Sequence, residues 1–235
     1  MQQLIEHAGL LLARDEQSFC SLKEIDISDT PEKIKYSPDF TPLLEPKAIS
    51  ASLDLPDNYV CIIPNNKMFA HEPVEFKHRY LNFLTETIGV VETLGLQAVL
   101  LNHEGEKDHK FCLELLSEQS NKPLYLKDLS ALETKKIIGS SVFCVSSRFH
   151  GCVSSLSQGV PALATSWSHK YEELYRYYQC SEDLVDVSLS AERLKEKLVQ
   201  IVKDRALVSS RLSKLAKQHR AMNREMWTMV FFVMS

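Results

Sequence analysis

The feature that most constrains the fold is a regular alternation of short, continuous apolar runs with amphipathic segments from residue 59 onward. The apolar runs include YVCII, AVLL, VFCV and PALA, and a stretch with helical spacing of apolar residues follows each of them. Uninterrupted apolar runs are typical of parallel strands that helices cover on both faces. The strand–helix alternation favours the same arrangement. Residues 59–235 are therefore predicted to form a doubly wound, Rossmann-like α/β domain with a parallel sheet.

The segments between the apolar runs carry helix signals. The stretch from His78 to Gly95 has apolar residues at helical spacing, and its glycine is a typical helix end. Ser130 and Glu133 have the spacing of a capping box. In HKYEELYRYYQ the tyrosines share one face, which is more typical of helix packing than of a stacking platform. The helical pattern at residues 190–227 is so long that we expect two helices there.

The first 45 residues predict only a piece of a second α/β unit. GLLLARD predicts a buried strand, DEQSFCSLKEI predicts a helix that begins near Asp15 or Ser18, and KIKYS predicts another strand. Two parallel strands would leave their outer edges unpaired. We therefore interpret residues 1–45 as the trailing part of an N-terminal α/β lobe. Residues 46–58, with their prolines, serines and aspartates, are the predicted linker to the catalytic lobe at 59–235.

Composition excludes several classes of protein. The 235 residues carry a net charge of −4, and lysine and arginine are interleaved with acidic residues, so no basic stripe for nucleic acid is present. The six cysteines form no C-x-x-C pair, which indicates a reducing compartment, and their spacings fit no common zinc site. We expect a cytoplasmic protein without a bound metal. The apolar tail MWTMVFFVMS is too short to span a bilayer, and we expect it to pack on the protein, with a membrane-surface contact as the alternative.

Polar side chains follow the predicted strands at the ends where doubly wound sheets bind their ligands. The candidates at these positions are Asn65, His103, Arg148, His150 and Lys170. Because the carboxyl ends of parallel strands share one edge of the sheet, these side chains should gather into a cationic, titratable cluster. The sequence therefore predicts a cleft for an anionic ligand at this edge.

The string SSRFHG is the most informative piece of the cluster. Arg148 offers a planar donor fork for carboxylate or phosphate, and His150 begins a predicted helix whose N-terminus favours anions. Gly151 lets that helix approach the sheet or a ligand closely. A doubly anionic small molecule or a sugar nucleotide would suit such a site. An equally weighted interpretation has Arg148 in a salt bridge with a neighbour and His150 only capping the helix.

The other candidates also have structural interpretations. Lys170 either neutralises an anionic ligand or is a solvated lysine beside Glu172. His103 and Asp108 either form an acid–base pair, because histidine titrates near neutral pH, or line a polar turn. Asn65 either bonds sugar hydroxyls or only shapes a turn.

Taken together, these strings resemble the polysaccharide pyruvyl transferase family. SSRFHGCVSSLSQGVPALATSWSHKYEEL is similar to the family signature, in which S-R-x-H-G heads a helix and a G-x-P strand leads to a lysine. IPNNKM and LLNHEGEKD resemble its earlier C-lobe pattern, and LLLARDEQSFCSLKE followed by SPDF resembles the end of its N-terminal lobe. The resemblance covers nearly the whole chain. Family members begin with a Gly-rich, N-x-G-D-like segment that this chain lacks.

The resemblance implies a GT-B-like fold of two Rossmann-like lobes. It also implies transfer of a pyruvyl group from phosphoenolpyruvate to a sugar of a surface polysaccharide or its precursor, with formation of a ketal. Arg148 and His150 would bind the donor or assist proton transfer, Lys170 would be a further anion ligand, and Arg14 would face the cleft between the lobes. No cofactor is implied. The partners would be phosphoenolpyruvate, a sugar or oligosaccharide acceptor, and membrane-associated polysaccharide assembly machinery at the inner face of the membrane.

Two other functions stay open at this stage. A nucleotide-sugar glycosyltransferase of the same fold would need a carboxylate for the ribose or the base, and Glu172 or Glu173 could supply it. A non-catalytic sugar-binding remnant would fit the absence of most of the N-terminal lobe. The acceptor sugar, the oligomeric state and the activity of the chain on its own stay open as well.

Overall fold

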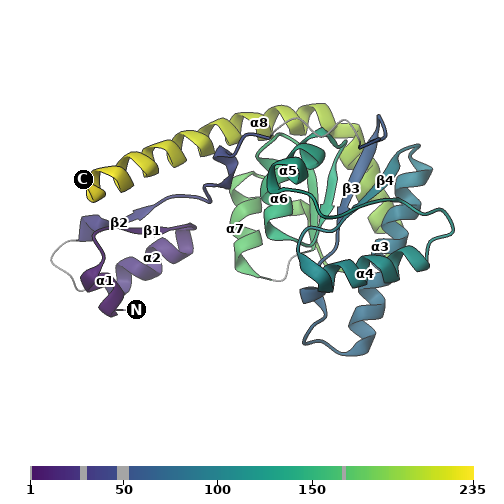
Figure 1. Cartoon of the computed structure of the whole chain (residues 1–235), viewed down its shortest axis with the longest axis horizontal. Coiled ribbons are helices and arrows are strands. Elements are labelled where there is room, and N and C mark those ends of the chain that lie inside the picture. Colours follow the sequence, from purple (N-terminus) through teal and green to yellow (C-terminus); the bar gives the residue numbers. More distant parts are fainter. Residues whose placement is uncertain (1, 27–30, 47–52, 166–167) are drawn as a thin grey trace.

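The computed structural model describes residues 2–26, 31–46, 53–165 and 168–235, and its larger part is a six-stranded sheet between two layers of helices (Figure 1). All strands of this sheet are parallel, in the order β5-β4-β3-β6-β7-β8. Their bounds are β3 Tyr59–Ile63, β4 Gln97–Leu101, β5 Leu124–Leu126, β6 Cys144–Ser146, β7 Ala162–Thr165 and β8 Leu184–Val185. The chain starts in the middle at β3, moves to one edge and returns to β6, which is the Rossmann strand order. The predicted doubly wound α/β sheet is confirmed.

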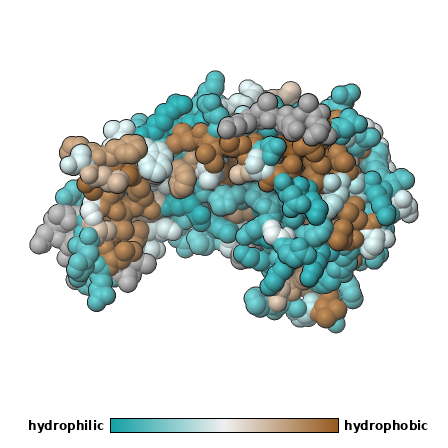
Figure 2. Space-filling model, in the orientation of Figure 1, coloured by the Kyte–Doolittle hydropathy of each residue, from teal (hydrophilic) through white to brown (hydrophobic). Residues whose placement is uncertain are grey.

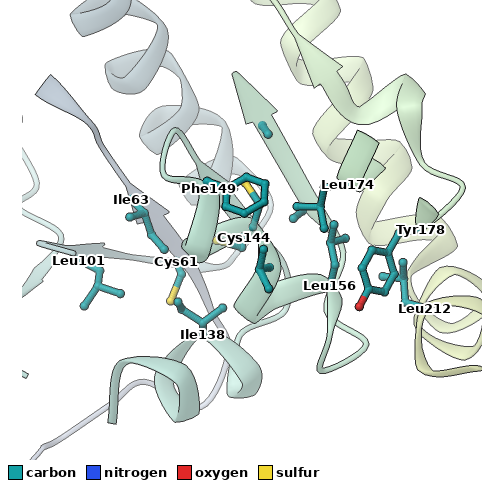
Figure 3. Close-up of a cluster of buried hydrophobic side chains, with 14 of the residues drawn as sticks. Cys61, Ile63, Leu101, Ile138, Cys144, Phe149, Leu156, Leu174, Tyr178 and Leu212 are labelled. Atoms are coloured by element: carbon teal, nitrogen blue, oxygen red, sulfur yellow. The ribbon is translucent and has the colours of Figure 1, made fainter. Parts of the chain in front are cut away.

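Central strand β3 supplies residues to both cores, because successive side chains of a strand point to opposite faces. Val60 and Ile62 join the core with α3 (Val74–Thr93), α4 (Gly105–Ser117) and the first turns of α8 (Ala191–Met234). Cys61 and Ile63 join the opposite core with α5 (Ala131–Ser140), α6 (Phe149–Leu156) and α7 (His169–Tyr177) (Figure 3). Burial raises the pKa of Cys61 to about 12, so this thiol packs as a small apolar side chain.

The helices around the sheet follow the expected order, although the first of them begins at Val74, before the predicted start at His78. They are α3 Val74–Thr93, α4 Gly105–Ser117, α5 Ala131–Ser140, α6 Phe149–Leu156, α7 His169–Tyr177 and α8 Ala191–Met234. The predicted capping box is present at α5, where Glu133 N–H donates to Ser130 Oγ at 3.3 Å and the Glu133 carboxylate accepts Ser130 N–H at 2.9 Å. Tyr171, Tyr175 and Tyr178 are fully buried, which confirms their packing role.

Helix α8 is one continuous helix of 44 residues, so the expectation of two helices was wrong. Neither glycine nor proline interrupts it. Its first part packs Leu194 and Leu198 on one core, and its middle packs Leu212 and Ala216 on the other. The helix therefore packs on both cores, on either side of the region where a break was expected, and stays continuous through it. None of the described helices has the combination of length and hydropathy that crossing a membrane requires.

The N-terminal segment forms a small separate sheet. It contains α1 Gln2–His7, β1 Leu11–Ala13, α2 Glu16–Ile25 and β2 Ile34–Tyr36. β1 and β2 pair in parallel, and Asp15 caps α2 by accepting Ser18 N–H at 2.7 Å. The last turns of α8 reach this unit (Figure 1), where Val233 lies against Gly9, while Phe232 is 80% exposed. The tail thus packs on the protein only in part. The predicted linker at 46–58 lies partly outside the described residues, and the domain boundaries stay a prediction.

Candidate active site

The strand order reverses between β3 and β6, and the candidate site lies where these two strands end. A cleft of 120 Å³ opens there, and all five strand-end candidates line it: Asn65, His103, Arg148, His150 and Lys170. A larger cavity of 580 Å³ lies beside it, between the N-terminal segment and α7. Phe149 and Lys170 line both. The predicted gathering of these side chains at one sheet edge is therefore confirmed.

Arg148 is held by two carboxylates. It is only 6% exposed, its Nε donates to Asp108 Oδ2 at 2.8 Å, and its Nη2 lies 2.5 Å from the same oxygen. Its Nη1 pairs with Glu104, whose side chain is 60% exposed. Asp108 is fully buried and also accepts the backbone N–H of Asn66 at 2.9 Å. Asp108 therefore fixes the guanidinium from inside the protein, and Glu104 meets it from the solvent side.

His150 faces a carboxylate from the N-terminal segment. It lies in the first turn of α6 with 53% of its side chain exposed, and its Nε2 is 3.4 Å from Asp39 Oδ2. The Asp39 carboxylate also accepts Thr41 N–H at 3.0 Å and Thr41 Oγ1–H at 2.5 Å. Although burial acts in the opposite direction, the hydrogen bonds from His150 and Thr41 hold the pKa of Asp39 well below its usual range. A permanent negative charge thus faces the imidazole.

Helix α8 holds Asp39 in place. The Asp39 carbonyl accepts hydrogen bonds from His219 Nε2 at 3.0 Å and from Asn223 Nδ2 at 2.9 Å, and His219 Nδ1 lies 3.0 Å from the Tyr178 hydroxyl. Sequence reasoning did not include Asp39 among the site residues. The only signal was the string SPDF, which carried the family resemblance and gave no contact with His150.

Stability should fall between about pH 6.5 and pH 4 because of His219. Burial lowers the pKa of His219 from 6.5 to about 4, so the folded protein keeps the ring neutral while the unfolded chain binds a proton. The unfolded state binds more protons in this window, and the free energy of unfolding therefore decreases as pH falls. His219→Gln should remove on the order of 3 kcal/mol of this pH dependence in urea unfolding, at about 1.4 kcal/mol per pKa unit. An unchanged profile in His219→Gln would contradict this assignment.

Positive charge gathers around Lys170. Burial, followed by the charges of Arg14, Lys67 and Arg148, lowers the pKa of Lys170. Lys170 Nζ lies 5.1 Å from the centre of the Phe149 ring, and Arg14 Cζ lies 4.9 Å from the same centre. Arg14 lines the larger cavity with 46% of its side chain exposed, at 3.9 Å from the Asp39 carboxylate. Four cations from separate parts of the chain thus line the cleft, the cavity or both.

His103 adds a neutral ring to this cluster. Burial, followed by the charges of Arg148 and His150, lowers the pKa of His103 to about 4. The expected alternative of an acid–base pair between His103 and Asp108 does not match the hydrogen bonds, because the Asp108 carboxylate binds Arg148 and a backbone N–H. His103 is therefore an uncharged donor or acceptor beside the cleft at neutral pH.

Asn65 joins the loops that follow β3 and β6 by hydrogen bonds. Its Nδ2 donates to the Ser147 carbonyl at 2.9 Å, and its Oδ1 accepts Lys67 N–H at 2.9 Å. In these bonds the Asn65 side chain shapes the turn after β3, which was one of its two expected roles. They also fix the backbone that carries Lys67 into the lining of the cleft.

Gly151 allows α6 to lie close to the sheet. A Cβ at this position would lie 2.5 Å from Ser146 Oγ and 3.0 Å from Ile63 Cδ1. Ser146 Oγ cannot move without cost, because it donates to the Arg148 carbonyl and accepts Arg148 N–H. Gly151→Ala should therefore lower the free energy of unfolding by about 1–3 kcal/mol in urea titration.

Gly89→Ala is the matched control for this substitution. Gly89 lies inside α3, and no atom is within 4 Å of the position of its Cβ. Alanine is the better helix former, so this variant should be as stable as the wild type or up to about 1 kcal/mol more stable. Equal free energies of unfolding for Gly151→Ala and Gly89→Ala would show that the close approach of α6 to the sheet does not contribute to stability.

The strand order, the cleft at the point of reversal and the helix layers define a GT-B-like α/β fold, and solved structures share this fold. The Neisseria meningitidis UDP-GlcNAc 2-epimerase bound to UDP-GlcNAc has a TM-score of 0.65 at 12% identity, covering 95% of this chain and 62% of that one. The S. aureus MnaA–UDP co-structure has a TM-score of 0.66 at 11% identity, covering 97% and 60%. S. aureus TarM, in complex with Fondaparinux, alpha-GlcNAc-glycerol and UDP, has a TM-score of 0.52 at 12% identity, covering 97% and 45%.

The chain spans less than two thirds of the length of these structures, and at such identities the likeness shows the fold alone. None of the curated proteins matches the sequence. The polysaccharide pyruvyl transferase family model matches residues 1–169. The chain therefore belongs to the polysaccharide pyruvyl transferase family.

Proposed function

We propose that this chain contributes to the transfer of a pyruvyl group from phosphoenolpyruvate to a sugar of a surface polysaccharide or its precursor, with formation of a ketal. The observation that carries the proposal is the cationic cleft of 120 Å³ at the ends of β3 and β6. Lys67, Arg148 and Lys170 line it, and burial, followed by repulsion from Arg14, Lys67 and Arg148, lowers the pKa of Lys170. Phosphoenolpyruvate is a small molecule with a carboxylate and a phosphate, so it would relieve this repulsion.

The arrangement around Arg148 supports a donor site. Asp108 holds one side of the guanidinium inside the protein, and the exposed Glu104 binds Nη1 from the solvent side. We infer that, before an anionic ligand binds, Glu104 occupies the position on the Arg148 guanidinium that the ligand would take. An incoming carboxylate or phosphate would displace Glu104 while Asp108 keeps the donor fork in position.

Ketal formation needs proton transfers that His150 is suited to carry out. The methylene carbon of phosphoenolpyruvate accepts a proton and becomes a methyl group, which leaves C2 electron-poor. One sugar hydroxyl then attacks C2 and loses its proton, phosphate leaves with the C–O bonding electrons, and a second hydroxyl of the same sugar attacks C2 and loses its proton. Protons released by the hydroxyls balance the one taken up by the methylene carbon and the one taken by phosphate. Asp39 would stabilise the imidazolium form of His150 during these steps.

The rival function is a nucleotide-sugar glycosyltransferase with the same fold. Its nucleotide would need a carboxylate near Lys170. Glu173 is already paired with Arg176 at 2.7 Å, and Arg176 also binds Glu16 at 2.8 Å. Of the two candidate carboxylates, Glu173 is thus engaged elsewhere, and Glu172 is exposed and lines neither the cleft nor the larger cavity. This arrangement supports the pyruvyl donor instead.

Acceptor-dependent release of phosphate from phosphoenolpyruvate tests the proposal. The chain would be assayed with a panel of galactosides and N-acetylmannosaminides. Lys170→Met should raise the KM for phosphoenolpyruvate by about tenfold or more, which corresponds to about 1.4 kcal/mol of lost binding. Lys136→Met, at an exposed lysine outside both cavities, should leave KM unchanged. Turnover of a UDP sugar without use of phosphoenolpyruvate would favour the glycosyltransferase.

A further inference from the structure

We propose that Thr41 is a positioning residue for the proton transfers of His150. It fixes the Asp39 carboxylate with Oδ2 toward His150 Nε2. This contact keeps a hydrogen on Nε2 and leaves Nδ1 as the ring atom that moves the proton. The inference rests on the proposed function, and it names the residue and the nitrogen on which the proton transfers of that function depend.

The two oxygens of the Asp39 carboxylate have separate partners. Oδ1 accepts both Thr41 N–H at 3.0 Å and Thr41 Oγ1–H at 2.5 Å. Oδ2 lies 3.4 Å from His150 Nε2 and 3.9 Å from Arg14 Nη1. Only 9% of the Asp39 side chain is exposed, so few water molecules compete with these donors. The bonds from Thr41 therefore decide which oxygen faces the imidazole.

Thr41 is itself held by the larger domain. Its carbonyl accepts a hydrogen bond from Lys135 Nζ at 2.8 Å, and Lys135 belongs to α5 and is 5% exposed. The same carbonyl accepts Leu44 N–H at 3.0 Å. Thr41 also begins a short 3₁₀ helix, Thr41–Leu43, which contacts α6 and α8. Its N–H, hydroxyl and carbonyl are thus all engaged, and it forms a fixed point for the neighbouring carboxylate.

The bonds from α8 to Asp39 do not orient its carboxylate. His219 and Asn223 bind the Asp39 carbonyl and so fix only the main chain, whereas the terminal torsion of an aspartate is broadly distributed. The connection that follows β2 runs from the N-terminal unit to the larger domain (Figure 1), and the surface is hollowed between these parts, beneath α8 (Figure 2). Asp39 and Arg14 both line the 580 Å³ cavity there. Without the Thr41 hydroxyl, the carboxylate would be free to turn toward Arg14.

The position of Asp39 selects the tautomer of His150. The partner of one imidazole nitrogen determines which nitrogen carries the hydrogen. A carboxylate beside Nε2 accepts a hydrogen bond from Nε2–H, so the lone pair of the neutral ring is on Nδ1. Because His150 lines the cleft, Nδ1 is the nitrogen left for a donor bound there.

Both proton transfers then take place at Nδ1. The Nδ1–H bond of the imidazolium breaks as the methylene carbon of phosphoenolpyruvate gains its C–H bond. The neutral Nδ1 afterwards takes the proton that a sugar hydroxyl loses when its oxygen attacks C2. Throughout these steps the hydrogen on Nε2 stays between the ring and Asp39.

Nitrogen-15 NMR of the histidine rings tests the tautomer without phosphoenolpyruvate. The His150 signals are those that are missing in His150→Gln. At alkaline pH, where the ring is neutral, the wild-type chain should show a hydrogen on Nε2 and an unprotonated Nδ1. Thr41→Val keeps the shape of the side chain but loses the hydroxyl, so its two ring nitrogens should show the averaged shifts of a tautomer mixture.

Two further variants make the comparison specific to the hydroxyl. Thr41→Ser keeps the donor and should restore the wild-type nitrogen shifts. Thr93→Val is the matched control, because the exposed Thr93 hydroxyl donates only to the Val90 carbonyl within its own helix. Its His150 signals should equal those of the wild type. Circular dichroism would show that each variant is folded, and Thr41→Ala provides the same test if valine disturbs the packing.

The kinetic expectation follows from the role in orientation. Thr41→Val should lower kcat for pyruvyl transfer by about tenfold, which is part of the 10²- to 10⁴-fold typical of a lost general acid or base. Its KM for phosphoenolpyruvate should stay within twofold of the wild-type value, because Thr41 does not line the cleft. Thr41→Ser should recover at least half of the wild-type kcat.

The outcomes separate this inference from the proposed function. A tautomer change in Thr41→Val that Thr41→Ser reverses supports the role of Thr41 even if phosphoenolpyruvate is not consumed, in which case only the proposed reaction is wrong. A hydrogen on Nδ1 in the wild-type chain, or equal nitrogen shifts in the wild type and Thr41→Val, would overturn the inference. If phosphoenolpyruvate is consumed, an unchanged kcat in Thr41→Val would overturn it as well.

Discussion

Replacing His150 by glutamine should reduce the rate of pyruvyl transfer by about 10²- to 10⁴-fold, the range typical of a lost general acid or base. The substitution should leave the fold intact, because 53% of the His150 side chain is exposed and its contact is a single carboxylate at 3.4 Å. Glutamine keeps a hydrogen-bond donor for Asp39 but cannot carry a proton. The measurement is acceptor-dependent phosphate release at saturating phosphoenolpyruvate, together with the unfolding midpoint in urea.

His169 offers a closely matched control. It begins α7 as His150 lies at the start of α6, its side chain is 56% exposed, and its Nε2 is 3.8 Å from a carboxylate of the N-terminal segment, Asp15. It lines neither the cleft nor the cavity. His169→Gln should retain the wild-type rate. Equal losses in the two variants would mean that contact between the N-terminal segment and the helix starts, rather than proton transfer by His150, limits the reaction.

Asp108→Ala should lower the free energy of unfolding by about 3–5 kcal/mol, because it leaves the buried Arg148 guanidinium without its inner partner. Asp108 is fully buried and Arg148 is 6% exposed, so water cannot replace the lost carboxylate. The substitution also removes the acceptor for the Asn66 N–H. Urea unfolding followed by circular dichroism measures the loss.

Glu104 serves as the control on the same guanidinium. Its side chain is 60% exposed, so Glu104→Ala should cost no more than about 1 kcal/mol. The double variant Asp108→Leu with Arg148→Met replaces the buried pair by apolar side chains and should regain most of the stability lost in Asp108→Ala. A loss in Asp108→Ala as small as that in Glu104→Ala would contradict the view that Asp108 anchors the arginine.

The sheet could be predicted because its signal is local and repeated. Each apolar run is short, uninterrupted and followed by a helical pattern, and a buried parallel sheet is the arrangement that satisfies all of them. The same reasoning failed for α8. Its length suggested a break, but packing of Leu194 on one core and Leu212 on the other holds a single helix, and the sequence pattern does not reveal long-range packing of this kind.

The topology of the sheet allowed the prediction that the site residues lie close together. It did not allow prediction of which acidic residue pairs with each cation. Strand ends of a parallel sheet share an edge, so His103, Arg148 and Lys170 had to approach one another. The choice of Asp108 as the partner of Arg148 depends on side-chain directions that the spacing of residues does not encode. Asp39 was harder still, because it reaches His150 from a different unit and is positioned by hydrogen bonds from α8.

The central claim is that a donor bound in the cleft gives its pyruvyl carbons to a sugar. The most direct measurement is NMR of the product after the chain is incubated in D₂O with phosphoenolpyruvate and the galactoside that gives the greatest phosphate release. In D₂O the proton-transferring group carries deuterium, so the methylene carbon of phosphoenolpyruvate would become a methyl group with one deuterium. We expect this methyl group in a ketal attached to the sugar, in an amount equal to the phosphate released. Phosphate release with free pyruvate as the only carbon product would contradict the claim. So would transfer of a sugar to the same galactoside when a UDP sugar replaces phosphoenolpyruvate.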